Sequence, residues 1–251
     1  MNLTGRTILI TGGTSGIGQA LAEAFHQRGN QVIIAGRRQA LLDEITAAHP
    51  GMHGHQIDMR DPAAITRLTE DIEALFPDLD MLVNNAGISQ LEAWDDDAID
   101  VDTSLATIEM NILGVLRLTA ALLPTLSRQP SATIITTTSG LAFVPRSSYA
   151  TYCASKAFLH SWLQSLRHQL RRKSIEVIEL APPYVQTELA GPQQANDPAA
   201  MPLADYIAEV IALLEGPAPA DGEILVERVK ALRTAERRGV YREVFASLNP
   251  A

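Results

Sequence analysis

Apolar and polar positions follow two different rhythms along this chain. Short runs rich in isoleucine and valine predict buried strands, and longer stretches with apolar residues every three to four positions predict helices with one buried face. The predicted strands cover Thr7–Thr11, Val32–Ala35, His53–Asp58, Met81–Asn84, Thr133–Thr137, Glu176–Ala181 and Glu223–Glu227. The predicted helices cover Gly16–Arg28, Gln39–Ala48, Pro62–Phe76, Leu105–Leu126, Tyr149–Arg172 and Leu203–Leu214.

The regular alternation of strand and helix predicts right-handed crossovers within an α/β fold. We expect a Rossmann-type, doubly wound, seven-stranded parallel sheet with helices on both faces. Because the sequence has no internal repeat and no dividing linker, we interpret residues 1–251 as one domain. After the last predicted strand, the sequence indicates a strand that runs into a charged helix.

Two segments break the rhythm. Glu188–Pro202 carries three prolines and no apolar period, which predicts a loop of the length that often forms a functional lid. Asp95–Asp102 contains five aspartates, which we interpret as the acidic, solvated start of a helix in preference to a metal site.

The overall composition argues against several classes of partner. A net charge of −9 and a pI near 5.1 disfavour a general nucleic-acid or anionic-membrane surface. A single cysteine leaves no internal disulfide, and no apolar run approaches the roughly 18 residues of a membrane span. The N-terminus leads straight into the first strand, without the layout of a signal peptide. We therefore expect a cytoplasmic protein with no nucleic-acid or membrane partner.

The first predicted strand ends in the glycine-rich stretch TGGTSGIG, which also opens a helix. Gly12, Gly16 and Gly18 allow a tight turn and a close ligand approach, while the helix N-terminus offers N–H groups to a phosphate. The spacing departs from the GxGxxG fingerprint of dinucleotide sites, so a purely structural turn is the alternative interpretation.

The end of the second strand bears on the choice of cofactor. An NAD site places a carboxylate there for the ribose 2′-hydroxyl, but this chain has Gly36 followed by Arg37 and Arg38. Two guanidinium groups favour the 2′-phosphate of NADP, and NAD is less favoured. The alternative is that both arginines simply begin a surface helix.

The stretch YATYCASK holds a tyrosine and a lysine that share one helix face. Tyr152 and Lys156 are four residues apart and therefore one turn apart, and the chain has only three lysines. An incidental polar pair on an amphipathic helix is the alternative. Ser139 ends the fifth predicted strand, 13 residues before Tyr152.

With TGGTSGIG, NNAG at Asn84–Gly87, Asn111, Ser139 and YCASK in this order, the chain resembles the short-chain dehydrogenase/reductase family over nearly its full length. The N-terminal stretch and the segments LAFVP, LHSWLQSLRHQL and VIELAPP resemble a narrower branch, the DltE-like oxidoreductases. The resemblance implies an NADP(H)-dependent enzyme that interconverts a carbonyl and a secondary alcohol.

The resemblance also implies a role for each catalytic residue, namely Asn111, Ser139, Tyr152 and Lys156. Tyr152 would exchange the proton. Lys156, with the oxidised nicotinamide nearby, would lower the pKa of the Tyr152 phenol, near ~10 when free, and Lys156 would also bind the nicotinamide ribose. Ser139 would hold the substrate oxygen, and Asn111 would hold a water in the proton relay.

Other residues are implied as ligands of the cofactor and the substrate. Asp58 would bond the adenine amino group and Thr187 the nicotinamide carboxamide. The implied cofactor-binding set is Gly12, Thr14, Ser15, Gly16, Ile17, Gly18, Arg37, Arg38, Asp58, Met59, Asn85, Ala86, Gly87, Tyr152, Lys156, Pro182, Val185 and Thr187. Phe143, Tyr149 and Tyr184 are expected to face the substrate, and Arg146 either meets a substrate carboxylate or is simply solvated.

The chain also departs from the family pattern. Pro183 stands where the family usually has glycine, which stiffens the backbone expected beside the nicotinamide and removes one N–H donor. The C-terminus lacks the family's usual Gly-Gly turn, which argues against the ketoacyl-carrier-protein reductases and their tetramer contact.

We expect a homodimer or homotetramer, because members of the family usually associate through the two corresponding helices. Leu116, Leu123, Trp162 and Leu166 are the candidate contact residues, and core packing explains them equally well. His49, His53 and His55 are interpreted as exposed residues and not as a metal site, and we expect no metal.

Two other functions compete with the enzyme hypothesis. One is a regulatory or structural subunit on the same fold that binds NADP without turnover. The other is an epimerase or dehydratase of the extended relatives, which 251 residues leave no room for.

Overall fold

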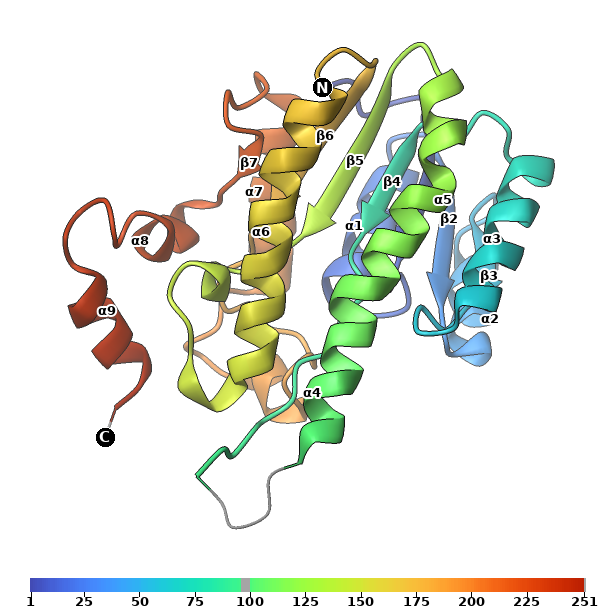
Figure 1. Ribbon diagram of the computed structural model, residues 1–251. Coiled ribbons are helices and arrows are strands. Elements are labelled where there is room, and N and C mark those ends of the chain that lie inside the picture. Colours follow the sequence, from blue (N-terminus) through green and yellow to red (C-terminus); the bar gives the residue numbers. More distant parts are fainter. Residues whose placement is uncertain (96–99, 251) are drawn as a thin grey trace.

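The computed structural model describes residues 1–95 and 100–250, and these form seven strands in one parallel sheet with helices on both faces (Figure 1). The strands are β1 (Thr7–Thr11), β2 (Gln31–Gly36), β3 (His53–Gln56), β4 (Met81–Asn84), β5 (Ala132–Thr137), β6 (Ile175–Leu180) and β7 (Glu223–Ile224). The helices are α1 (Gly16–His26), α2 (Gln39–Ala48), α3 (Pro62–Leu75), α4 (Val101–Ile108), α5 (Gly114–Arg128), α6 (Ala150–Leu170), α7 (Leu203–Glu215), α8 (Lys230–Arg233) and α9 (Tyr241–Leu248). The predicted fold class is confirmed.

The strand order β3-β2-β1-β4-β5-β6-β7 places a topological switch between β1 and β4. In such sheets, ligands bind beyond the carboxyl ends of the strands at this point, because the connections leave in opposite directions. The glycine turn after β1 and the NNAG segment after β4 therefore lie side by side.

Alternating strand residues build two separate cores, one on each face of the sheet. Ile8 and Ile10 of β1 pack with α1, α2 and α7, whereas Leu9 packs with α3, α5 and α6. Both faces are apolar because both are covered, which explains why the strands have continuous runs of isoleucine and valine. Figure 1 shows α3, α5 and α6 in front of the sheet and α1 behind it.

The long helix predicted at Leu105–Leu126 is interrupted. It begins as α4 at Val101, changes to a π-helical segment at Glu109–Leu113 and continues as α5. The stretch Val101–Arg128 is long and apolar enough to cross a membrane by length and composition, contrary to our expectation from the sequence. Its buried leucines, including Leu118 and Leu122, pack on the sheet, so we interpret it as a core helix.

The predicted last strand, Glu223–Glu227, is wrong in length. The ladder with β6 has only the pairs Glu179–Glu223 and Leu180–Ile224, and a 3₁₀ turn follows at Glu227–Val229. The ladder stops because β6 is followed by Pro182 and Pro183, which have no N–H to donate. The short helix α8 then replaces the expected continuous charged helix, and α9 follows later.

The two segments without helical or strand rhythm behave as loops. Glu188–Pro202 contains only a 3₁₀ turn at Pro192–Asn196, as a loop prediction requires. Asp100 is the N-cap of α4, with its side chain accepting from the N–H groups of Asp102 and Thr103, so the acidic helix start is confirmed there. Residues 96–99 of the aspartate-rich stretch lie outside the described part of the chain.

Candidate active site

The glycine turn after β1 is shaped by close backbone contacts. Gly12 and Gly16 have positive φ angles of 69° and 53°, which glycine adopts without strain. A Cβ on Gly18 would lie 2.3 Å from the carbonyl oxygen of Gly12 and 2.4 Å from Nδ2 of Asn85. Only glycine therefore lets α1 start this close to the ends of β1 and β4. Ile17, between Gly16 and Gly18, is half-buried and packs against the core.

Arg38 lies against this turn. Its Nη2 donates to Ser15 Oγ at 2.9 Å and to Thr14 Oγ1 at 3.1 Å. Ser15 is the N-cap of α1, and no described side chain caps the first N–H groups of the helix. Free N–H groups, a helix dipole and a guanidinium therefore meet at one point, which is the chemistry of an anion site.

Arg37 and Asp58 lie nearby, at the ends of β2 and β3. Arg37 is exposed, and its carbonyl accepts a hydrogen bond from Gln56 at 3.0 Å. Asp58 forms an ion pair with Arg60 at 2.6 Å, and this hydrogen bond holds the pKa of the Asp58 carboxyl below its ordinary value. The predicted contact of Asp58 with adenine stays a prediction. Met59 is buried and backs Gly114 of α5.

The segment after β4 is fixed to β1 through Thr11. The Thr11 hydroxyl oxygen accepts from the N–H groups of Asn85 and Ala86 at 3.0 and 3.1 Å, and Asn85 Nδ2 donates to the Thr11 carbonyl. These bonds place Ala86 against Gly12, where an added Cβ would lie 3.0 Å from Ala86 Cα. Hydrogen bonds between side chains and neighbouring backbone, together with close backbone packing, therefore hold the edge of the predicted cofactor site.

Asn111 lies in the π-helical segment and joins this region to α6. Its Oδ1 accepts from Ile88 N at 2.9 Å, and its Nδ2 donates to Ile88 O at 3.0 Å and to Ser155 Oγ at 3.1 Å. Gly87 lies close to both Asn111 and Lys156, since a Cβ added to it would be 3.3 Å from Asn111 Oδ1 and 3.6 Å from Lys156 Nζ. The predicted relay water at Asn111 stays a prediction.

Ser139, Tyr152 and Lys156 are brought together as the sequence predicts. All three are buried, with exposed fractions of 8%, 6% and 4%. Lys156 Nζ lies 5.7 Å from the centroid of the Tyr152 ring and donates to the carbonyl of Thr137 at 2.9 Å. Ser139 Oγ accepts from Leu141 N at 3.1 Å. A carbonyl group placed here would meet two hydroxyls, with an ammonium behind them.

Burial dominates the pKa values of Tyr152 and Lys156. It raises the pKa of the Tyr152 phenol to about 12, and the hydrogen bond with Ser139 offsets only part of this rise. Burial also lowers the pKa of Lys156 to about 8. The lowering that we expect from Lys156 together with the oxidised nicotinamide stays a prediction.

The segment after β6 approaches the glycine turn from the other side. Thr187 lies over Gly16, whose added Cβ would be 3.3 Å from Thr187 Cγ2. Val185 is buried and bridges to Met201, and the carbonyl of Pro182 accepts from Gly140 N at 2.8 Å. Thr187 therefore lies beside the glycine turn, and the cofactor contacts of Pro182, Val185 and Thr187 stay predictions.

Gln194 ties the loop Glu188–Pro202 to this segment. Its Nε2 donates to Val185 O at 2.8 Å and to Thr187 Oγ1 at 3.2 Å, and its Oε1 accepts from Ala190 N at 2.8 Å. Tyr184, also in the segment after β6, donates to Asp197 at 3.1 Å. The function of this loop as a lid stays a prediction.

The other predicted substrate residues follow Ser139 in the chain. The Arg146 guanidinium carbon lies 5.9 Å from the centroid of the Tyr149 ring. The Phe143 ring meets His160 edge-on at 4.9 Å and has Arg233 above it, also at 4.9 Å. Phe143 therefore contacts a charged cluster that the sequence did not reveal.

That cluster and Glu92 are the site residues that sequence reasoning missed. Glu92 accepts from the N–H and hydroxyl of Thr151, next to Tyr152, at 2.6 and 2.7 Å. Glu179 is fully buried on β6 and binds His160, while Arg233 forks onto Glu223 of β7. A glutamate inside a buried strand was the available signal, since such a strand otherwise reads as a continuous apolar run.

The histidines and the predicted contact face have mostly local partners. His49 bonds to Ile45 O, His53 packs on Phe76, and His55 lies 3.6 Å from Asp71. Leu166 is buried in the core, and Leu123 and Trp162 pack against that core while Leu116 is half-buried. Core packing therefore explains Leu166.

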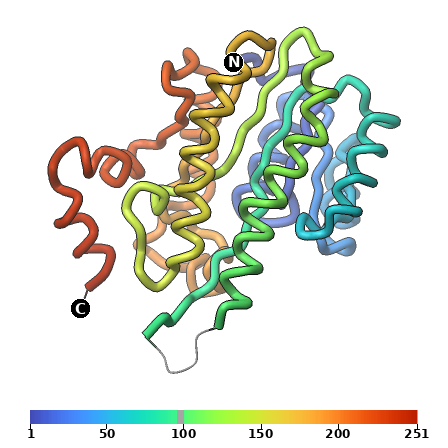
Figure 2. The backbone as a smooth tube through the Cα atoms, in the orientation of Figure 1, coloured from blue at the N-terminus to red at the C-terminus, as the bar shows by residue number. Residues whose placement is uncertain are grey.

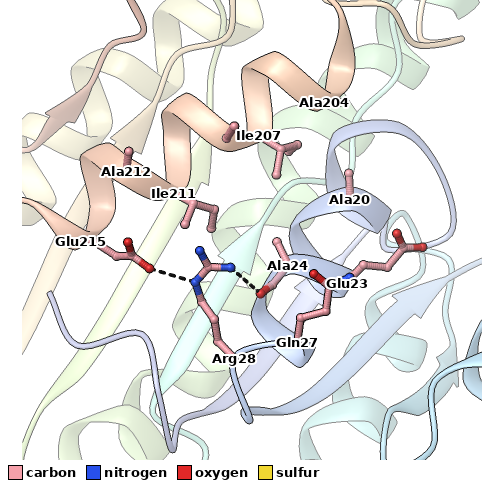
Figure 3. A pocket seen from close by; sticks show the side chains of 11 residues that line it. Ala20, Glu23, Ala24, Gln27, Arg28, Ala204, Ile207, Ile211, Ala212 and Glu215 are labelled. Atoms are coloured by element: carbon pink, nitrogen blue, oxygen red, sulfur yellow. Dashed lines mark hydrogen bonds and ion pairs between the residues drawn. The ribbon is translucent and has the colours of Figure 1, made fainter.

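A groove of about 470 Å³ lies elsewhere, between α1 and α7. Alanines and isoleucines line it, and Arg28 closes one end through Glu215 and the carbonyl of Ala24 (Figure 3). None of the predicted catalytic residues lines this groove, so we do not regard it as the active site.

Known proteins match this fold and arrangement. The model of the short chain dehydrogenase family matches residues 6–198. The chain is 40% identical over 251 residues to the uncharacterized oxidoreductase DltE of Bacillus subtilis (strain 168), covering 99% of this chain and 98% of that protein.

Solved structures agree with these matches. A short chain dehydrogenase from Burkholderia cenocepacia J2315, in complex with NADP, has a TM-score of 0.83 at 25% identity, covering 98% of both chains. A 3-ketoacyl-(acyl-carrier-protein) reductase from Brucella melitensis, complexed with NADH, has a TM-score of 0.77 at 26% identity, covering 86% of this chain and 93% of that one.

The fold, the buried Ser-Tyr-Lys group and these matches together define a short-chain dehydrogenase/reductase, and the chain belongs to that oxidoreductase family. Within the family, its likeness to DltE along nearly the whole chain puts it in the DltE-like branch.

Proposed function

We propose that this protein is an NADP(H)-dependent oxidoreductase that interconverts a carbonyl and a secondary alcohol, with Tyr152 as general acid and base. The observation that carries the proposal is the convergence of Ser139, Tyr152 and Lys156, all buried, at the carboxyl edge of the sheet. This edge also carries the glycine turn, so one site offers a place for a dinucleotide and a proton donor beside it.

The residues present fit a bound NADP(H). The N-terminus of α1 and the glycine turn would hold its pyrophosphate, because the side chain of the N-cap residue Ser15 makes no hydrogen bond to the first N–H groups of the helix. Arg38 already lies on Thr14 and Ser15, where it would meet the 2′-phosphate together with Arg37. When bound, NADPH supplies a hydride to a carbonyl carbon.

The protein's own groups would handle the proton. With a pKa of about 12, the Tyr152 phenol stays protonated at neutral pH and can donate to a developing alkoxide. The Ser139 hydroxyl would hold the same oxygen as charge develops. A cation brought close to Tyr152 would lower its pKa and help proton return in the oxidation direction. Lys156, fixed on the Thr137 carbonyl, keeps its ammonium within reach of the phenol.

The first experiment measures binding of NADPH and NADH, by fluorescence and thermal shift, to wild type and to the double variant Arg37→Ala, Arg38→Ala. We expect wild type to prefer NADPH, and the double variant to lose about a hundredfold in NADPH affinity with NADH little changed. The matched control is Arg171→Ala, Arg172→Ala, a pair of adjacent exposed arginines far along the chain. Equal binding of both cofactors by wild type contradicts the choice of NADP.

Turnover separates the enzyme from the non-catalytic alternative. NADPH oxidation is followed with a panel of aldehydes, ketones and β-keto esters, and NADP⁺ reduction with secondary alcohols and 3-hydroxy acids. Tight NADPH binding with no turnover across the panel favours the regulatory or structural subunit. Absence of binding to either cofactor removes both proposals.

We further propose that the protein works on a small molecule, in the cytoplasm, as a single domain that forms a homodimer or homotetramer. The half-buried Leu116 and exposed Leu105 and Phe158 on neighbouring helices would take part in such a contact. Light scattering after size exclusion tests the oligomer, and a monomeric mass contradicts it.

A further inference from the structure

Five side chains form a charged cluster beside the catalytic turn, named here the Glu179 cluster: Thr138, His160, Glu179, Glu223 and Arg233. The cluster joins the end of β5, the helix α6, the strands β6 and β7 and the C-terminal segment. Figure 2 shows that segment, in red, running beside the turn after β5.

Glu179 stands at the centre of the cluster with both carboxylate oxygens in use. Oε1 accepts from the Thr138 hydroxyl at 2.7 Å, and Oε2 lies 2.7 Å from Nδ1 of His160. The side-chain nitrogen of Gln164 donates to His160 Nε2 at 2.8 Å, so the imidazole carries its proton on Nδ1 and donates to Glu179. Glu179 is 0% exposed, so each bond is made without competition from water.

The two residues that Glu179 binds lead directly to the catalytic groups. Thr138 is the backbone neighbour of Ser139. His160 follows Tyr152 and Lys156 at four-residue spacing, so all three lie along one face of α6. The carboxylate therefore connects the strand end that carries Ser139 to the helix that carries Tyr152.

Arg233 reduces the electrostatic repulsion between the buried carboxylates of Glu179 and Glu223. Glu179 and Glu223 are directly opposite in the ladder between β6 and β7, and like charges in that position repel. Arg233 forks onto Glu223, with Nε to Oε2 at 2.6 Å and Nη2 to Oε1 at 2.9 Å. Ligand atoms of His160, Glu179 and Glu223 lie within 4.8 Å of one another, but Arg233, Thr138 and His160 already satisfy the carboxylates, so we do not assign a metal.

The C-terminal segment also packs on the catalytic turn itself. A Cβ on Gly140 would lie 2.7 Å from Leu232 Cδ1 and 2.8 Å from Val229 Cγ2. Arg233 covers the ring of Phe143 at 4.9 Å. One short stretch of the C-terminal segment, residues 229–233, thus contacts both Gly140 and Phe143, which follow Ser139 in the chain.

We propose that Glu179 is a positioning residue for Ser139 and Tyr152, and that Arg233 of the C-terminal segment holds it in that role. Buried ionic clusters are weak contributors to stability compared with apolar packing, so fixed geometry is the better reason for this one. The proposal rests on the proposed function, because it concerns the geometry of the same catalytic site.

The test compares two small changes at Thr138. Thr138→Val keeps the shape and removes the hydroxyl that Glu179 binds, whereas Thr138→Ser restores it. Amide hydrogen exchange of the peptide spanning residues 138–149 reports the local tether. We expect Thr138→Val to speed exchange there about tenfold and Thr138→Ser to return it to the wild-type rate.

A control removes a threonine–glutamate hydrogen bond elsewhere. Thr125 is fully buried and donates at 2.9 Å to Glu73, whose side chain is 44% exposed, between α5 and α3. Thr125→Val should lower global stability and leave exchange in residues 138–149 unchanged. If Thr138→Val and Thr125→Val affect this peptide equally, the positioning proposal is overturned.

Kinetics with a carbonyl compound from the panel adds a second readout. Thr138→Val and Arg233→Gln should lower kcat roughly ten- to hundredfold with NADPH affinity unchanged, because the cofactor cradle is untouched. An unchanged kcat overturns the proposal even if exchange rises. If wild type turns over no compound, the proposed function fails, and the exchange measurement still decides whether the Glu179 cluster holds the turn.

Discussion

Two regions at the carboxyl edge of the sheet are stabilised by different kinds of contact. The glycine-turn side, which comprises residues 11–18, 36–38 and 84–88, is held by close backbone packing and by hydrogen bonds of Thr11, Arg38 and Asn85. The cluster side, which comprises residues 138–143 and the Glu179 cluster, is held by buried charges from distant parts of the chain. The glycine-turn side has no space for added side-chain atoms, whereas the geometry of the cluster side depends on the pairing of its buried charges.

This difference suits the two partners that we propose. A dinucleotide presents an invariant shape and phosphate charge, which a fixed backbone cradle matches without adjustment. Proton transfer to a substrate oxygen requires the hydroxyls of Ser139 and Tyr152 to point at the same atom. Networks of side-chain contacts can fix such orientations. The two sides should therefore fail in different ways when they are changed.

The largest expected effect is on turnover by Tyr152→Phe. Removing the phenolic hydroxyl removes the proton donor, so we expect kcat to fall by about a thousandfold with NADPH binding kept. Steady-state kinetics and cofactor titration measure the two quantities separately. Tyr149→Phe is the control, since Tyr149 lies three residues away and is predicted to face the substrate without exchanging the proton, and it should lose far less. Equal losses in the two variants would place the proton donor elsewhere.

A steric change should break the glycine-turn side. In Gly18→Ala the added Cβ would meet the backbone oxygen of Gly12 at 2.3 Å, and backbone cannot move aside as a side-chain tip can. We expect a loss of about 3 kcal/mol in the free energy of unfolding, together with weakened NADPH binding. Urea unfolding measures the first quantity. Gly216→Ala is the control, because its φ of −73° suits alanine and its added Cβ would meet nothing nearer than the Leu213 carbonyl oxygen at 3.3 Å, so a small shift of a few tenths of an ångström relieves the contact.

The free energy of unfolding should depend on pH through the buried ammonium of Lys156. Burial lowers the pKa of Lys156 to about 8, so the unfolded chain binds more protons than the folded one above that pH. Stability attributable to this group therefore rises from pH 8 toward the ordinary lysine pKa near ~10.4.

Comparison with Lys156→Met isolates this contribution. Relative to that variant, wild type should gain on the order of 2 kcal/mol between pH 7 and pH 9.5, measured by urea unfolding at each pH. The interval stops short of the Tyr152 phenol, whose raised pKa acts in the opposite direction between its ordinary value and about 12. A flat difference between the two proteins would contradict a buried, destabilised ammonium.

The glycine-turn side was predictable because its determinants are local in sequence. Gly12, Gly16 and Gly18 lie in one stretch, and Arg38 reaches the turn from the end of the neighbouring strand. Tyr152 and Lys156 were predictable for the same reason, since one helical turn separates them. The fold followed from strand and helix rhythm, which depends only on which face of each element is buried.

The cluster side was not predictable because its contacts join distant positions. His160 and Glu179 are 19 residues apart, and the side chain of Glu92 caps Thr151 59 residues later. The shortness of β7 depends on two prolines after β6, and the raised pKa of Tyr152 depends on packing depth. Each of these requires knowing which surfaces meet, and periodicity carries no such information.

The π-helical segment at Glu109–Leu113 has a consequence for how this protein can change in length. A π turn contains one residue more than an α turn, and one residue rotates a helix face by about 100°. Deleting a single residue there would give a more regular helix and turn Asn111 away from Ile88 and Ser155. Loops on the surface can gain or lose residues with little effect, whereas the length of this helix is constrained, because the extra residue of the irregular turn orients the Asn111 amide toward Ile88 and Ser155.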